Sequence, residues 1–156
     1  MSYVLEALLL SPEARDRFQR ALPKIVIVQL APEVAMVPLT EDELKQLGSL
    51  DPVCQIGDEG EFSGLTKGVI EELSRLTQYS LAAFVGALYT GGPGTQWGVI
   101  FLNGRPTAPP AISGSFINRA LAKLGIRAAN GMDEFDTVGL GRHRHTEDWI
   151  INDSCI

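Results

Sequence analysis

The C-terminal part of the chain holds its densest group of side chains that could do chemistry. Both histidines, His143 and His145, lie two positions apart, and Glu147 follows at the same interval. In an extended strand these side chains would project to one side, where two imidazoles and a carboxylate could hold zinc or another transition metal. Arg142 and Arg144 alternate with the histidines, and their positive charge opposes a divalent cation. We therefore expect no metal site, and keep a metal-assisted enzyme that uses residues 143–147 as an alternative.

The same segment also has a structural interpretation. The two arginines could form ion pairs with Asp133, Glu134 or Asp136, which precede them in the chain. Such a network would lock the C-terminal segment onto the rest of the domain. We expect this structural role rather than a catalytic one.

Other catalytic patterns do not fit the sequence. The loop Gly91-Gly92-Pro93-Gly94 is not followed by Lys-Ser/Thr, and the next element is predicted to be a strand, so it is interpreted as a hairpin turn rather than a phosphate cradle. Neither Cys54 nor Cys155 has an obvious base, and no serine lies in a Gly-x-Ser-x-Gly turn. The sequence predicts no catalytic residue, no enzyme and no cofactor.

Charge is distributed unevenly along the chain. Residues 41–72 carry nine carboxylates against two lysines, a balance of −7, whereas residues 105–144 have a balance of +3. An acidic stretch repels phosphate backbones and speeds the encounter with a basic protein, although it also suits a solvated surface. Trp97 follows the hairpin turn and could be an exposed interface anchor or a core residue. The predicted partner-binding residues are Asp58, Glu59, Glu61, Glu71, Glu72 and Trp97.

The composition is that of one globular domain over residues 1–156. Hydrophobic residues make up 45% of the chain and charged residues 21%. The opening Met1-Ser2-Tyr3 lacks the basic region of a secretory signal, and no apolar run approaches the roughly 20 residues of a membrane span. Two cysteines make no disulfide framework. We expect a cytoplasmic protein that binds neither membrane nor nucleic acid.

The predicted fold class is α+β, an antiparallel sheet of hairpins packed against three to four short helices. Strands are expected at 2–9, 24–30, 34–39, 79–90 and 96–102, and Asn103-Gly104 predicts a further tight turn. Ser11-Pro12-Glu13 and Thr40 with Glu43 are typical helix starts. Two more helices are predicted at 65–76 and 116–124 from the spacing of their apolar residues. Pro38 suggests that the third strand ends at a sheet edge.

Three segments resemble a group of small bacterial proteins, some of which are immunity proteins of polymorphic-toxin systems. They are Tyr89 to Gln96, Ile117 to Leu121, and the ending from Asp133 to Trp149, with Tyr89-Thr90-Gly91-Gly92 where such proteins often have Tyr-Phe-Gly-Gly. The resemblance implies a stoichiometric inhibitor that covers a toxin's active site. We expect a protein-binding module of this immunity type, whose partner is another protein such as a basic toxin domain. The alternative is an accessory subunit that joins a larger complex through an exposed strand edge near Pro38.

Overall fold

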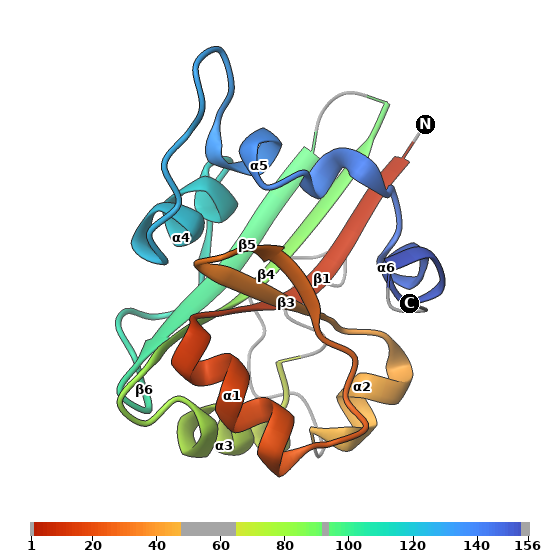
Figure 1. Cartoon of the computed structure of the whole chain (residues 1–156). Helices are drawn as coiled ribbons and strands as arrows, with labels where there is room; N and C mark the ends of the chain where they lie inside the picture. Colours follow the sequence, from red (N-terminus) through yellow and green to blue (C-terminus); the bar gives the residue numbers. More distant parts are fainter. Residues whose placement is uncertain (1, 48–64, 92–93, 154–156) are drawn as a thin grey trace.

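The fold is built on one antiparallel sheet. The computed structural model describes residues 2–47, 65–91 and 94–153, and only the backbone of 151–153. Within these residues the sheet has seven strands in the order β2-β3-β1-β4-β5-β6, and β7 also pairs with β5 (Figure 1). The strands are β1 (Ser2–Leu10), β2 (Val28–Ala31), β3 (Val34–Pro38), β4 (Leu81–Thr90), β5 (Gly94–Leu102), β6 (Arg105–Pro106) and β7 (Ala111–Ile112).

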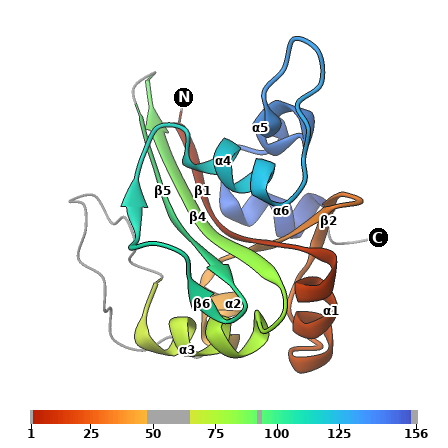
Figure 2. The same ribbon diagram turned by 90° about the vertical axis from the view of Figure 1, so that its left-hand side faces the viewer.

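Helices cover both faces of this sheet. In Figure 1 the helices α1 and α3 lie below the sheet strands, while α4 and α5 lie above them, and Figure 2 shows the same separation from the side. The helices are α1 (Pro12–Ala21), α2 (Glu41–Gln46), α3 (Lys67–Leu76), α4 (Phe116–Lys123), α5 (Glu134–Thr137) and α6 (Thr146–Asp153), with a short 3-10 helix η1 (Leu140–Arg142). The predicted α+β class with an antiparallel sheet is confirmed.

Alternation along the central strands creates two cores. In β1, Leu5, Ala7 and Leu9 point to one face and pack with α4, η1 and α6. Leu8 and Leu10 point to the other face and pack with α1 and α3. Successive side chains of a strand point to opposite faces, so a strand buried on both sides is apolar throughout, as Ala7 to Leu10 are. β1 and β4 therefore belong to both cores.

Local sequence signals account for several of the elements. Ser11 caps α1 by accepting the backbone N–H of Ala14 at 3.3 Å, as its sequence predicts. Asn103 and Gly104 both have positive φ, 54° and 81°, in the tight turn that leads from β5 into β6. The predicted helices at 65–76 and 116–124 are confirmed as α3 and α4.

Some predicted elements differ in the structure. The strand predicted at 24–30 is limited to β2, an edge strand of four residues, because Ile25 bonds back to Leu22 in the turn after α1. Pro38 is buried and pairs with Ala7 of β1, so the exposed edge expected there is wrong. Residues 143–147 are not a strand, and six helices replace the three to four expected over the described residues. The sequence also predicts a loop at 49–63 from its Gly, Pro, Asp and Ser residues, and this segment lies outside the described residues.

None of the described helices is long and apolar enough to cross a membrane.

Candidate functional site

One pocket brings aromatic and polar side chains together from four parts of the chain. It has a volume of about 300 Å³, and we call it the aromatic pocket. Apart from the buried Gln96 and the exposed Asp133, its walls are half-buried side chains. Ligand sites are commonly concave, with apolar or aromatic walls and a few convergent polar groups, which is the arrangement here. The lining residues are Tyr3, Tyr89, Gln96, Asn118, Asp133 and Phe135.

The sheet register positions the two tyrosines. Tyr3 of β1 pairs directly with Tyr89 of β4, and Tyr89 pairs with Gly94 of β5. Directly opposed residues of neighbouring strands have side chains on the same face of the sheet. A Cβ added at Gly94 would lie 2.0 Å from the Tyr89 ring, so this ring packs across a place that only glycine leaves open. Tyr3 and Tyr89 therefore form one wall of the pocket, and Gly94 leaves room for the Tyr89 ring.

Gln96 links that wall to α4. Its side-chain amide donates to the Tyr89 hydroxyl at 3.0 Å. Its Oε1 accepts the backbone N–H of Ile117 at 3.0 Å, which satisfies a free donor in the first turn of α4. Ser115 precedes this helix but makes no side-chain cap bond, although a serine before a helix commonly caps it. Gln96 thus fixes both Tyr89 and the helix that carries Asn118.

The opposite wall is α4 with the start of α5. Asn118 donates to Asp133 Oδ2 at 3.1 Å and accepts the backbone N–H of Phe135 at 2.8 Å. Asp133 also caps α5, because its Oδ1 accepts the backbone N–H of Asp136 at 2.8 Å. That backbone bond first, and then the Asn118 amide, holds the pKa of Asp133 below its ordinary value against the opposing effect of burial. Asp133 is therefore an ionised carboxylate at neutral pH.

Tyr3 joins the pocket to the C-terminal segment. Its hydroxyl donates to the Leu140 carbonyl oxygen at 2.8 Å. Its ring meets Phe135 edge to face, with centroids 5.6 Å apart and an interplanar angle of 61°. Burial raises the pKa of Tyr3 far above its ordinary value, so the hydroxyl keeps its proton. Tyr3 is thus a neutral aromatic wall whose oxygen still has an acceptor position.

The expected ion-pair network around Asp133 is wrong. In the described part of the chain Asp133, Glu134 and Asp136 form no ion pair with any arginine, lysine or histidine. The C-terminal segment is attached by other contacts. Val4 donates its N–H to the Arg144 carbonyl at 2.7 Å, and Trp149 is completely buried. The negative charge of Asp133 is therefore not offset by an ion pair to any of the described residues.

The histidines do not come together as a metal site. Residues 140–142 form η1 and 146–153 form α6, so His143, His145 and Glu147 do not share one side of a strand. The His143 ring packs edge to face on Trp149 at 4.7 Å, and His145 Nδ1 lies 3.6 Å from Asp148 Oδ2. Among the residues for which side chains are described, no group of three or more His, Cys, Asp or Glu could hold a metal ion.

The predicted acidic surface is only partly within the described residues. Asp58, Glu59 and Glu61 lie outside them, and Glu71 is exposed on α3. Glu72 is bound to Arg75 at 2.7 Å. On α2, Glu41 pairs with Lys45 at 3.4 Å, while Glu43 is buried and hydrogen-bonds Thr40. The described carboxylates of α2 and α3 are thus largely paired with local partners.

Trp97 is not an exposed anchor. Its side chain is 4% exposed and packs in the core beside α1 and α3. It lies opposite Gly86 of β4, where an added Cβ would come within 2.1 Å of the indole ring. Successive side chains of β5 point to opposite faces of the sheet. Gln96 faces α4, and Trp97 therefore points into the core beside α1 and α3, so the prediction of an exposed anchor is wrong.

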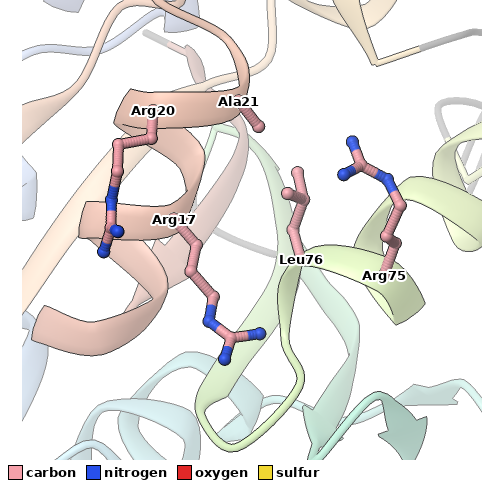
Figure 3. Close-up of a pocket in the computed structure, with 5 residues that line it drawn as sticks. All are labelled: Arg17, Arg20, Ala21, Arg75 and Leu76. Atoms are coloured by element: carbon pink, nitrogen blue, oxygen red, sulfur yellow. The ribbon is translucent and has the colours of Figure 1, made fainter.

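A second hollow is lined by arginines at the ends of two helices. Arg17 and Arg20 project from α1 and Arg75 from α3 around a hollow of about 480 Å³ (Figure 3). The ends of both helices lie here, and arginine side chains offset the negative end of a helix dipole. The Arg17 guanidinium also packs on the Tyr79 ring at 5.7 Å. These contacts give the arginines a role in stabilising α1 and α3.

No protein-family model, curated protein or solved structure matches this chain. The aromatic pocket is therefore singled out as a candidate site by its geometry alone. Its residues carry no motif of their own in the sequence, since strand pairing and helix packing bring them together from positions 3 to 135. Five of the six lining residues lie within residues 89–96, 117–121 and 133–149, the three segments singled out from the sequence.

Proposed function

We propose that this chain is a protein-binding module and that the aromatic pocket receives a side chain of its partner. The observation that carries this proposal is the pocket itself, in which half-buried aromatic rings surround a concave site held by strands and helices. Aromatic side chains in such sites contribute most of the binding energy in many interfaces, because they bury a large area with few rotatable bonds. A volume of about 300 Å³ suits one side chain or a small ligand.

The finer proposal is a stoichiometric inhibitor of a cognate bacterial toxin, of the immunity type. It is supported by the resemblance of residues 89–96, 117–121 and 133–149 to such proteins, and by the meeting of these segments at one pocket. A binding site commonly brings together segments that are far apart in the chain. The partner is then the toxin domain.

The test is neutralisation of a neighbouring gene product. Where the gene has a toxin-like reading frame directly upstream, that reading frame is expressed together with this chain, and growth and complex formation are measured. We expect growth to be restored and a 1:1 complex to form. Tyr89→Leu keeps an apolar side chain but removes the ring, and it should weaken the complex by about tenfold or more, as for truncated aromatic anchors.

The matched control is Tyr79→Leu. Tyr79 is 83% exposed and lies between α3 and β4, outside the pocket, so its replacement should change affinity by less than about twofold. A wild-type chain that neither binds nor neutralises the neighbouring product would contradict the immunity role. Equal affinities for wild type and Tyr89→Leu would show that the pocket is not the docking site.

A further inference from the structure

We propose that the aromatic pocket recognises a guanidinium group, so that the partner inserts an arginine side chain beside Asp133. This inference rests on the proposed function and names the chemistry of the partner at its site. The juxtaposition that carries it is one carboxylate, with no ion pair to any described residue, in a pocket lined by the rings of Tyr3, Tyr89 and Phe135.

The negative charge of Asp133 determines which sign of charge the pocket favours in a ligand. Asp133 is the one charged residue of the lining, and in the described part of the chain it forms no ion pair. Arg119 follows the lining residue Asn118 in the chain. Its guanidinium packs over the Phe116 ring, 5.9 Å from the ring centroid. A cation that enters the pocket would meet the exposed Asp133 carboxylate at its edge, and an anion would be repelled.

Beside the unused O–H of Tyr89, the pocket has unused acceptor positions that suit a ligand that donates hydrogen bonds. The carbonyl oxygens of Gln96 and Asn118 already accept the backbone N–H groups of Ile117 and Phe135. Lone pairs remain on the Asp133 carboxylate and on the hydroxyl oxygen of Tyr3, which donates its proton to Leu140. A guanidinium offers only donors, five N–H groups in a planar fork, and so matches these acceptors.

The aromatic walls favour a planar cation over a compact one. A guanidinium stacks on aromatic faces and is more weakly hydrated than an ammonium group, so it loses less when it leaves water. Tyr3 and Phe135 stand at 61° to each other, and a planar group could therefore pack on one ring while it meets the edge of the other. Lysine would keep the charge but lose the stacking.

The test uses small blocked amino acids and does not depend on knowing the partner. N-acetyl-arginine methylamide, the corresponding lysine compound and the citrulline compound are titrated into the full chain, and the Asn118 and Gln96 side-chain amides are followed by NMR. Citrulline has the shape of arginine without its charge. We expect saturable shifts with arginine, weaker binding of lysine, and binding of citrulline reduced by about tenfold or more.

Two Asp→Asn variants distinguish the effect of the charge in the pocket on arginine binding from the effect of a charge elsewhere on the surface. Asp133→Asn retains a good helix cap and removes the charge, so it should weaken arginine binding by about tenfold while the fold is kept. Asp16→Asn makes the same chemical change at an exposed position of α1 and should leave binding within about twofold. Circular dichroism of each variant checks that both are folded.

Other outcomes would overturn the proposal in distinct ways. Equal binding of the arginine and citrulline compounds, or tighter binding of the citrulline compound, would assign the pocket to uncharged ligands. Absence of shifts with every compound would remove the guanidinium site. A protein partner whose binding is lost in Tyr89→Leu but unchanged in Asp133→Asn would leave the proposed function standing and overturn this inference alone.

Discussion

Glycines in the central strands make room for the large aromatic side chains of this protein. Gly94 accommodates the ring of Tyr89 in the aromatic pocket, and Gly86 accommodates the indole of Trp97 in the core. Gly98 does the same for Phe116, where an added Cβ would lie 2.2 Å from the ring. Glycine weakens a strand by its backbone entropy, so its presence inside a strand often marks a close approach. Here each approach is that of an aromatic ring.

Gly86→Ala should therefore destabilise the protein although it adds only one methyl group. The new Cβ would lie 2.1 Å from Trp97, whose ring is 4% exposed and cannot move outward without losing its packing. Overpacking of this kind costs about 1–3 kcal/mol of unfolding free energy. Gly114→Ala is the control, because Gly114 is exposed and an added Cβ has no neighbour within 4 Å. Urea unfolding measures both, and equal midpoints would contradict the packing argument.

At the scale of elements, the C-terminal segment is fastened along β1. Val4 forms an isolated parallel bridge with His145, and its N–H donates to the Arg144 carbonyl at 2.7 Å. The Thr146 hydroxyl accepts the backbone N–H of Glu6 at 3.1 Å and lies 3.4 Å from the Val4 carbonyl oxygen. Trp149 then fills the core beside α4. The C-terminal segment is thus attached to β1 close to Tyr3, and this attachment couples the segment to the aromatic pocket.

Thr146→Val should loosen this attachment with almost no change of shape. Thr146 is 5% exposed, and the variant removes the acceptor of the part-buried Glu6 N–H, at a cost of about 1–3 kcal/mol. Hydrogen exchange of the Glu6 amide should become faster, and the unfolding free energy should fall. Thr107→Val, at an exposed position, is the control and should stay within about 0.5 kcal/mol of wild type. Unchanged exchange at Glu6 would show that the hydroxyl does not hold the segment.

At the scale of the molecule, local signals predict the elements but not the places where they meet. The Ser11 cap, the Asn103-Gly104 turn and the apolar spacing of α3 act within a few residues, and the sequence shows them. Tyr3 and Tyr89 meet only through the pairing of β1 with β4, for which the sequence holds no local signal. The short helix α5 was also missed, since four residues give no helical period, although Asp133 is a good cap. The pocket lies where these long-range contacts converge.

The two cores should unfold together, because β1 and β4 contribute to both. The chain has two tryptophans, and each reports on one core: Trp97 packs with α1 and α3, and Trp149 with α4 and η1. Trp149→Phe and Trp97→Phe each leave a single fluorescent probe, at the cost of some stability. In a cooperative domain the fluorescence and circular dichroism midpoints of a given variant coincide in urea, whichever core the remaining probe occupies. If the Trp149 signal in Trp97→Phe changed well before the circular dichroism, the α4–α6 layer would unfold on its own, and the aromatic pocket on that layer would open before the rest of the molecule.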